Sequence, residues 1–461
     1  MTKTSVAPKV QGLPPEIRAV TEVYLESLNC PRSLTVHILI RYGEWDQVAR
    51  LKAKPIDYAT SSDYHLAACA TDWLRKSPDL PVKVDRRAEA IKSWHQSEEE
   101  CRISNIFLRD ARLNHDELSA LIDVASSFVA DVLGPCPLDL TPRFGPGATV
   151  SDLSTNTTVL DKVSSPPTLT SEAACLLSLW DGTAWERSHF NSELRRKDGL
   201  NPRIVRGNAF FTVPKTALID RGCSKGPSIN VSYQLAVGRV MRDRMRTRIG
   251  LDLSSGQAVH QLLARIGSKS GLFATLDSER ASDTMAKTLV DRLLSKSGFW
   301  PDLLNSLREE QTSIDGEWFH IHKFSAMGNG FTFELESLLF LSLCYAVGWA
   351  HGLGGFPGEF SEHTVDSLVS NSFITTYGDD IIVPTFMADD VMRLLNACGF
   401  TVNLQKSYLE GEFRESCGGD FYRGVDVSTP KLTKSIQTPA DWFSVHNLLK
   451  KRFVDQYPCL N

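Results

Sequence analysis

The spacing of hydrophobic residues divides the chain into a mainly helical first part and a mixed second part. Residues 98–108 and 118–133 carry apolar positions every three to four residues, the period of an amphipathic helix, and we expect roughly the first 135 residues to be mainly helical. Residues 135–168 are rich in Pro, Gly, Ser and Thr and predict a long ordered loop or linker. Helix is expected to return at 171–180 and 184–196.

From residue 272 onward, short apolar runs alternate with helical patterns. Residues 272–277 predict a strand, and 373–383 predict a hairpin because β-branched and aromatic residues flank a Gly-Asp turn signal. Strands and helices mixed in this way favour an α+β fold, with an antiparallel sheet backed by helices on one face. The remaining patterns predict helices at 286–294, 331–349 and 388–398, a helix end entering a strand at 399–406, and a further hairpin at 413–427.

The composition is that of a large globular protein. The 461 residues are 42% hydrophobic and 23% charged, enough for two or three domains with a large core. The ten cysteines include no Cys-x-x-Cys pair, which argues against a zinc site or a disulfide framework and favours a reducing, intracellular setting. The longest apolar stretch, 338–350, is shorter than the roughly 20 residues of a membrane span, and no apolar signal core begins the chain, so we expect a soluble protein.

The charge is unevenly distributed. The net charge of −5 gives no global sign of a nucleic-acid partner, yet residues 201–250 contain ten Arg and Lys against two Asp. Such a local excess predicts a surface for an anionic ligand. The arginines from Arg239 to Arg248 fall partly on one helical face, where they could contact template phosphates or remain solvated.

Two adjacent acids, Asp379 and Asp380, stand in the predicted turn of the 373–383 hairpin. Two carboxylates that close together repel, and a bound divalent metal is the simplest group that would keep both ionised near neutral pH. In isolation, an Asp-Asp pair is usually a solvated turn. Asp277 ends the 272–277 strand, and if that strand lies beside the hairpin, the three acids meet at one end of the sheet. They would then hold two Mg²⁺ ions for in-line phosphoryl transfer.

A glycine-punctuated loop at 325–334 runs into a predicted helix. Its glycines let the backbone approach a ligand, and Asn329 offers both a donor and an acceptor. We expect Ser325, Gly328 and Asn329 to contact a nucleotide, with Asn329 and Asp283 together sensing the ribose 2′-hydroxyl. The alternative is an ordinary loop with a capping Asn.

Basic residues could serve the phosphates of such a nucleotide. Lys215, Arg221 and Lys225 are spaced along a segment that is otherwise apolar or turn-rich, where they could neutralise a triphosphate or form a solvated face. Lys406 could protonate the leaving pyrophosphate as a general acid, or it could be an ordinary surface lysine. The 413–427 hairpin could support the 3′ end of a growing strand or only complete a sheet edge.

Taken together and in this order, these segments resemble the replicases of the positive-strand RNA bacteriophages, the Qβ-like leviviruses. The match is dense from about residue 205 to 430, and its most specific part is the SAMGNGFTFELES run of 325–337 beside the YGDD run of 377–380. The other matching segments are Thr212–Lys215 with Asp220 and Arg221, Arg242–Arg244, Asp277 with Ala281–Asp283, Gly399–Thr401, Phe413–Gly418 and Gly424–Val427.

The resemblance implies a right-hand polymerase with fingers, palm and thumb, which copies an RNA template from ribonucleoside triphosphates with two Mg²⁺ ions, Mn²⁺ being a substitute. It implies Asp277, Asp379 and Asp380 as the metal ligands, no membrane partner, and the cytoplasm of a bacterial host. The well-known member works with the host elongation factors Tu and Ts and a ribosomal protein, which become candidate partners.

The domains expected on this basis are a helical N-terminal region and fingers at 1–265, a palm at 266–430 and a partial thumb at 431–461. Family members continue well past the segment that resembles 413–427, whereas this chain stops at Asn461. We therefore expect a shortened thumb, either in a minimal polymerase or in an incomplete reading frame.

Two rival functions are open at this point. A reverse transcriptase shares the acid-bearing hairpin, but Asp283 and Asn329 are present where a hydroxyl-sensing pair would help, and no nuclease-like acid cluster follows the palm. A non-catalytic RNA-binding or repressor protein could keep the fold as a scaffold, but the acids at all three positions argue against it.

Overall fold

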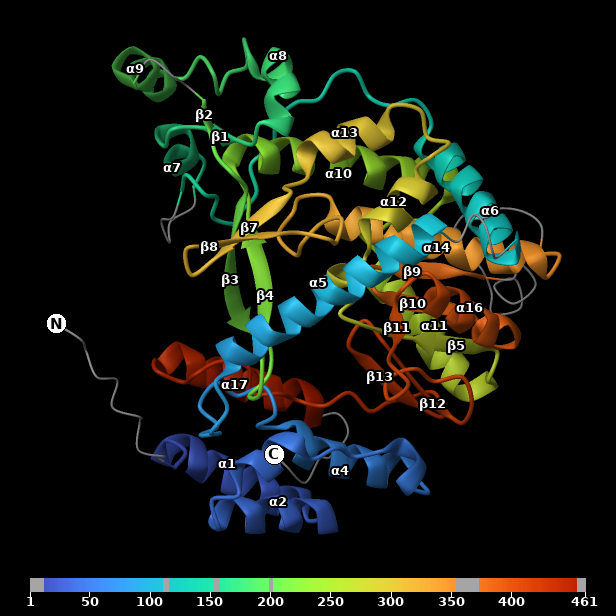
Figure 1. Cartoon of the computed structure of the whole chain (residues 1–461). Coiled ribbons are helices and arrows are strands. Elements are labelled where there is room, and N and C mark those ends of the chain that lie inside the picture. Colours follow the sequence, from blue (N-terminus) through green and yellow to red (C-terminus); the bar gives the residue numbers. More distant parts are fainter. Residues whose placement is uncertain (1–11, 111–115, 153–157, 199–201, 354–372, 454–461) are drawn as a thin grey trace.

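The chain has a mixed α+β fold, as the sequence predicts for the arrangement of helices and strands (Figure 1). The computed structural model describes residues 12–110, 116–152, 158–198, 202–353 and 373–453. Helices dominate the first part of the chain, as the sequence predicts, and the strands form several small sheets further along.

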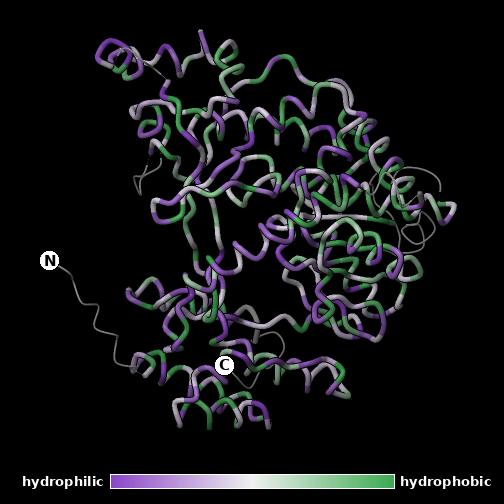
Figure 2. Tube along the Cα trace, in the orientation of Figure 1, coloured by the Kyte–Doolittle hydropathy of each residue, from purple (hydrophilic) through white to green (hydrophobic). Residues whose placement is uncertain are grey.

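The N-terminal helices form a bundle with a core of its own. They are α1 (Pro15–Leu28), α2 (Pro31–Arg41), α3 (Trp45–Arg50) and α4 (Ser61–Asp72), followed along the chain by the long α5 (Arg86–Asp110), with a 3₁₀ turn at Pro55–Asp57. Hydrophilic and hydrophobic residues alternate along these helices (Figure 2). Trp73 is buried in the bundle, where its indole nitrogen donates to the Thr21 hydroxyl. Helix α17 (Pro439–Phe453) packs on the same core through Val445, so the bundle joins both ends of the described chain.

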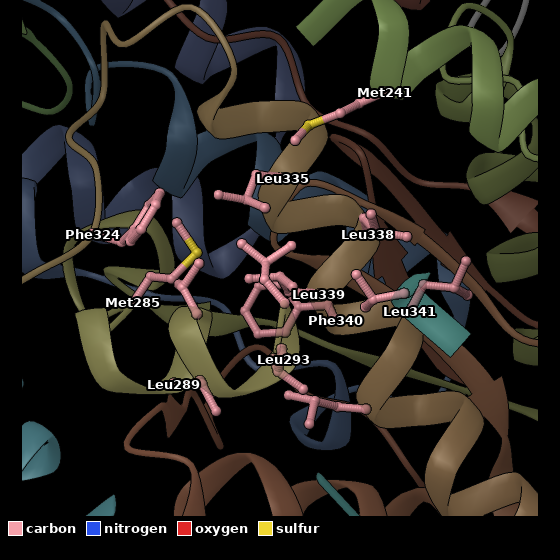
Figure 3. Packing of buried hydrophobic residues seen from close by; sticks show 14 of the residues in the cluster. Met241, Met285, Leu289, Leu293, Phe324, Leu335, Leu338, Leu339, Phe340 and Leu341 are labelled. Atoms are coloured by element: carbon pink, nitrogen blue, oxygen red, sulfur yellow. The ribbon is translucent and has the colours of Figure 1, made fainter. Parts of the chain in front are cut away.

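The main body is built around one large hydrophobic core. Its helices are α6 (Asp116–Leu133), α10 (Ser228–Ile249), α12 (Lys287–Leu293), α13 (Trp300–Leu307), α14 (Thr332–Ala350) and α16 (Ala388–Ala397). Figure 3 shows the centre of this core, where Leu335, Leu339 and Phe340 of α14 face Met285 and Leu293. Helix α5 crosses from the N-terminal bundle onto this body (Figure 1).

Helix α14 is the one described helix that is long and apolar enough to cross a membrane, because it begins at Thr332, ahead of the 338–350 stretch considered from sequence. Most of it, 78% of the apolar window, is buried inside the protein. Its apolar surface is therefore covered by the other helices of the core.

At the edge of the main body, the segments 171–180 and 184–196 contain less α-helix than the sequence predicts. The 171–180 pattern forms a 3₁₀ helix and one short turn of α-helix, and the 184–196 pattern becomes helical only at His189. Trp180 and Trp185 are both buried with their ring centroids 5.9 Å apart, so the chain bends between them to place both indoles in the core. The elements here are α7 (Val159–Ser164), β1 (Thr168–Leu169), a 3₁₀ helix (Glu172–Leu176), α8 (Leu177–Trp180), α9 (His189–Asp198) and β2 (Arg203–Ile204).

A four-stranded sheet lies against α5, and its β3–β4 hairpin was not predicted. Its strands are β3 (Asn208–Pro214), β4 (Asp220–Lys225), β7 (Gln311–Ile314) and β8 (Glu317–His320), in the order β4-β3-β7-β8. The hairpin was missed because β4 is polar and contains Gly222, which usually signals a turn. That glycine is required for packing, since a Cβ there would lie 2.7 Å from the Phe210 ring.

The predicted central sheet is antiparallel, in the order β5-β10-β9. Its strands are β5 (Phe273–Leu276), β9 (Thr375–Tyr377) and β10 (Asp380–Pro384). Helices cover both of its faces, which corrects the expectation of helices on one face. Phe273 and Ile382 pack against α11 (Gly256–Ser270), whereas Ile381 and Val383 on the opposite face belong to the core around α14. Strands buried on both faces show no alternation in sequence, so the pattern could not reveal the second helix layer.

The second predicted hairpin is present as β12 (Phe413–Ser416) and β13 (Gly419–Tyr422), extended by β14 (Val425–Asp426), and it packs on α11. The remaining short elements are β6 (Ser278–Glu279), which pairs with β11 (Thr401–Val402), and 3₁₀ turns at Ala281–Asp283 and Thr385–Met387.

Truncating Leu339 to Ala should destabilise the protein by about 2–5 kcal/mol, because this fully buried side chain leaves a cavity in the main core. Urea unfolding followed by circular dichroism measures the loss. The control is Leu34→Ala on α2. This side chain is largely exposed, so its loss should lower the free energy of unfolding by no more than about 0.5 kcal/mol. Equal losses in the two variants would contradict the assignment of α14 to the core.

Candidate active site

The tandem acids stand on a tight hairpin turn. Strands β9 and β10 pair up to Tyr377 and Asp380, which leaves Gly378 and Asp379 as a two-residue loop. Gly378 has φ +60°, as expected for glycine at the first central position of a type II′ hairpin turn. Asp379 is therefore exposed at the tip, and Asp380 begins the next strand.

Helix α14 holds this turn in place. The Gly378 amide donates to the Ser337 hydroxyl at 2.8 Å, and the Thr376 hydroxyl donates to the Ser337 carbonyl at 2.7 Å. A Cβ on Gly378 would lie 3.0 Å from the Phe333 ring, which also packs edge to face on Tyr377. The SAMGNGFTFELES run and the YGDD run are thus in direct contact.

Asp277 lies at the same end of the sheet as Asp380. Strands β5 and β10 pair antiparallel with Leu276 opposite Ile381, so one residue further along the same register Asp277 stands opposite Asp380. The Asp277 Oδ2 accepts a hydrogen bond from Asn403 at 3.0 Å and lies 3.6 Å from the Lys406 ammonium. The predicted meeting of Asp277 with the tandem acids at one sheet end is therefore observed.

Asp380 is held by the second hairpin. Its Oδ1 accepts hydrogen bonds from the Ser416 hydroxyl at 3.3 Å and from the Cys417 amide at 3.2 Å. Burial, followed by the charges of Glu415 and Asp379, raises the pKa of Asp380 to about 7.

The carboxylates repel one another at this sheet end. Burial raises the pKa of Asp277, with Lys406 opposing the shift and Asp379 adding to it. Burial lowers the pKa of Lys406, but Asp277, Glu415 and Asp380 outweigh it and raise the pKa above its ordinary value. The half-exposed lysine is therefore protonated at neutral pH, as a proton donor must be.

The carboxylates suit a divalent cation by chemistry, though they are not arranged as a closed site. In the described part of the chain, no group of three or more His, Cys, Asp and Glu side chains is placed to hold a metal ion. Two oxygens are instead occupied by protein donors: Asp277 Oδ2 by Asn403 and Asp380 Oδ1 by Ser416 and Cys417. Carboxylate oxygens are the ligands Mg²⁺ prefers, and the raised pKa values of Asp277 and Asp380 show that added positive charge would stabilise their ionised forms.

Strand β4 carries two of the predicted basic residues beside the glycine loop. Arg221 and Lys225 are four residues apart on the strand and so lie on one face of the sheet. The Ser224 amide donates to the Met327 carbonyl at 2.8 Å, and a Cβ on Gly328 would lie 2.1 Å from the Ser224 carbonyl oxygen. Only glycine, here with φ +111°, allows this approach, so the loop follows the strand closely.

Lys215 follows β3 and connects the basic face to the acids. Burial, followed by Arg221 and Lys406, lowers the pKa of Lys215, while Asp379 and Asp283 oppose the shift. These charges act on Lys215 because they lie near it, so Lys215 and Arg221 share one region with Asp379 and Asp283.

Asp283 is paired with a buried lysine that the sequence analysis missed. The Lys323 ammonium lies 2.7 Å from Asp283 and 3.3 Å from Glu98 of α5, and its side chain is only 1% exposed. Glu98 also accepts from the Lys323 amide, at 3.3 Å. A lysine between His322 and Phe324 gives no sequence signal of burial, because its two partners lie 40 and 225 residues away along the chain.

In the glycine loop, one side-chain atom of Asn329 is hydrogen-bonded and the other has no partner among the described residues. The Asn329 Oδ1 accepts from the Phe331 amide at 3.1 Å, which closes a local turn just before α14. Its Nδ2 has no hydrogen-bond partner within the described residues. Ser325 is buried, and its hydroxyl accepts from Thr332 at 2.9 Å.

Glu336 of α14 is a second acid that the sequence analysis missed. It is buried, and burial followed by the charges of Asp379 and Asp283 raises its pKa well above the ordinary value. Its Oε1 has no hydrogen-bond partner in the part of the chain that the structure describes. A Glu within a helix usually indicates a solvated face, which is why it was overlooked.

The chain is similar in sequence to a known protein family. A family model described as RNA replicase, beta-chain matches residues 47–455. The RNA-directed RNA polymerase beta chain of Escherichia phage MS2 is 34% identical over 89% of this chain and 71% of its own length. The RNA-directed RNA polymerase subunit beta of Escherichia virus Qbeta is 30% identical over 94% of this chain and 70% of its own. A solved RNA-dependent RNA polymerase of a human picorbirnavirus aligns with 44% of the chain and 40% of its own length at 17% identity, with a TM-score of 0.32.

Replacing Lys323 with Met should destabilise the protein by about 3–5 kcal/mol, because Glu98 is left buried without its counterion and Asp283 loses its nearest cation. The control, Lys287→Met, removes a half-exposed ion pair with Asp291 on α12 and should cost less than about 1 kcal/mol. Urea unfolding of both variants provides the measurement. A loss for Lys323→Met as small as the control's would mean that the buried triad does not stabilise the fold.

Proposed function

The chain belongs to the RNA replicase beta-chain family and is an RNA-directed RNA polymerase, and we propose that it joins ribonucleotides at the Asp277 end of the central sheet. The proposed step is attack of a 3′-hydroxyl on the α-phosphate of the incoming nucleotide, with release of pyrophosphate. The observation that carries this placement is the β5–β10 register, which sets Asp277 opposite Asp380 with Asp379 in the adjoining turn.

Asp277, Asp379 and Asp380 would hold two Mg²⁺ ions, or Mn²⁺ in their place. Bound there, the ions would activate the attacking hydroxyl and stabilise the leaving oxygen. The carboxylate donor set and the mutual repulsion of the acids support this assignment. In this role Asn403 keeps Asp277 oriented, and the Ser416–Cys417 segment keeps Asp380 oriented.

The basic residues would serve the triphosphate. Lys215 and Arg221 bring positive charge from the turn end of the β3–β4 hairpin toward the acids, where they, with Lys225 further along β4, would neutralise the phosphates. Lys406, protonated and beside Asp277, would donate a proton to the departing pyrophosphate.

Ribose recognition would come from the glycine loop. Gly328 brings the loop backbone close to β4, and the Nδ2 of Asn329, buried without a partner among the described residues, would donate to a 2′-hydroxyl. Asp283 would accept from the same hydroxyl, with Lys323 fixing its position, and buried Ser325 would support the loop.

A right-hand arrangement fits these assignments. The palm, 266–430, contains the central sheet and all three acids, and the N-terminal region and fingers, 1–265, contribute the basic β3–β4 hairpin. The partial thumb, 431–461, contributes α17 within its described residues, which end at 453.

The partners that follow are an RNA template and product and ribonucleoside triphosphates, in the cytoplasm of a bacterial host. The relatives are named as beta chains or subunits, which supports a complex with further subunits. By the family resemblance, the host elongation factors Tu and Ts and a ribosomal protein are the proposed ones.

Replacing Asp379 or Asp380 with Asn should reduce nucleotide incorporation by at least about 10²-fold while RNA binding persists, because the fold is kept but charge at the reacting phosphate is lost. Primed-template extension with and without added bacterial lysate measures incorporation, so that a missing subunit is not mistaken for a missing ligand. Asp389→Asn, an exposed acid on α16, is the control. Near-parental incorporation by the Asp379 and Asp380 variants would exclude the metal assignment.

Replacing Asn329 with Ala should lower the preference for ribonucleotides over deoxyribonucleotides by about 3- to 10-fold, since one hydrogen bond to the 2′-hydroxyl is lost. Asn329→Asp keeps an oxygen to accept from the Phe331 amide but lacks the Nδ2 donor, and it should lose the preference as well. Competitive incorporation of the two nucleotide classes gives the ratio, and it also tests the reverse-transcriptase alternative. If Asn329→Asp keeps the parental ratio, Asn329 acts only in the local turn before α14.

A further inference from the structure

The turn that holds Asp380 has an unusual backbone. Ser416 pairs with Gly419, so Cys417 and Gly418 form a two-residue loop with φ +50° and +73°. Positive φ at both central positions is typical of a type I′ turn, where Asn, Asp and Gly are favoured. A cysteine in this conformation is strained, and such strain persists only where the surroundings impose it.

Helix α11 supplies those surroundings. Gln257, His260 and Gln261 are spaced by three and four residues and therefore share one face of the helix. The Nε2 groups of both glutamines donate to the Cys417 carbonyl, at 3.2 and 3.1 Å. Between them, the His260 Nδ1 lies 3.0 Å from the Ser416 hydroxyl oxygen.

These contacts form a chain of hydrogen bonds that ends at a carboxylate. The Ser416 hydroxyl has a single proton, and the Asp380 carboxylate at 3.3 Å is the stronger acceptor for it. The His260 Nδ1 must then carry a proton and donate it to Ser416, which assigns the tautomer from the network. His260 is fully buried, and burial lowers its pKa to about 3, so the ring is neutral.

The burial of His260 leaves one of its ring nitrogens, Nε2, without a hydrogen-bond partner among the described residues. An unpaired buried polar atom is unfavourable. The same helix lies against the catalytic turn from the other side, since a Cβ on Gly256 would be 2.7 Å from the Tyr377 ring. Helix α11 thus contacts both the β9–β10 hairpin, which carries the tandem acids, and the turn that holds Asp380.

We propose that His260 and Ser416 are positioning residues for the reaction, which fix the Asp380 carboxylate through Oδ1 and so set its affinity for the divalent cation. The proposal rests on the proposed function, because it takes Asp380 as a metal ligand. Neither residue touches the substrate in this role. Groups that orient a metal ligand in this way usually affect metal affinity strongly when they are removed.

The test compares four variants of the full chain with the parent. His260→Leu removes the donor, and Ser416→Ala removes the link. His260→Asn returns an amide N–H near the position of Nδ1. Ser342→Ala is the matched control, since that serine is equally buried but bonds only within α14, to the Leu339 carbonyl. Mn²⁺ binding to the purified chain is measured by electron paramagnetic resonance, alongside thermal unfolding without metal and the Mg²⁺ dependence of incorporation.

We expect His260→Leu and Ser416→Ala to weaken Mn²⁺ binding by about 10- to 100-fold and to raise the half-saturating Mg²⁺ concentration in parallel. His260→Asn should bind Mn²⁺ within about threefold of the parent, less than half a decade in affinity. If His260→Leu fails to fold, Ser416→Ala decides, because its packing change is small. Parental Mn²⁺ affinity in Ser416→Ala and in a folded His260→Leu, or a lowered unfolding temperature as the sole effect, would overturn the positioning role.

The variant Asp380→Asn separates this inference from the function on which it rests. If Asp380→Asn binds Mn²⁺ as the parent does, the proposed ligand set is wrong, and the positioning role fails with it. If Asp380→Asn loses Mn²⁺ while His260→Leu and Ser416→Ala keep it, the ligand set stands and only the positioning role is overturned.

Discussion

Electrostatic repulsion between carboxylates at one end of the β5–β10 pair is the constraint on which the rest of the site depends. The antiparallel register puts Asp277 opposite Asp380, and the two-residue turn adds Asp379 beside them. Burial, followed by the charges of Glu415 and Asp379, disfavours the ionised form of Asp380 and raises its pKa. A fold that keeps these acids together must supply positive charge and rigid support around them.

The support comes from helices on both faces of the sheet. Helix α14 holds the turn through Ser337 and the Phe333 ring, and α11 lies against Tyr377 on the other side. The glycine loop that leads into α14 is itself fixed on β4 by the close approach of Gly328 to Ser224. The basic hairpin, the glycine loop and the acid-bearing turn are thereby linked by direct packing contacts.

The positive charge comes from residues of very different burial. Lys406 is half-exposed and lies beside Asp277, where its ammonium is in contact with solvent. Lys323 is completely buried between Asp283 and Glu98, where it serves to fix an acid in place. The sequence does not distinguish the buried Lys323 from the half-exposed Lys406, because both are lysines whose partner carboxylates lie far away along the chain.

The sequence alone determined the acid-bearing hairpin, the strand that ends in Asp277, the glycine loop with its following helix, and the family, because turn chemistry and motif spacing are local properties. Tertiary structure alone decided that helices cover both faces of the sheet, that polar β4 is a strand, and that Lys323 and Glu336 are buried beside the site. It also decided that His260, more than 150 residues from Ser416, acts on the turn that holds Asp380. Burial and hydrogen-bond partners are set by segments distant in sequence, and local patterns do not contain that information.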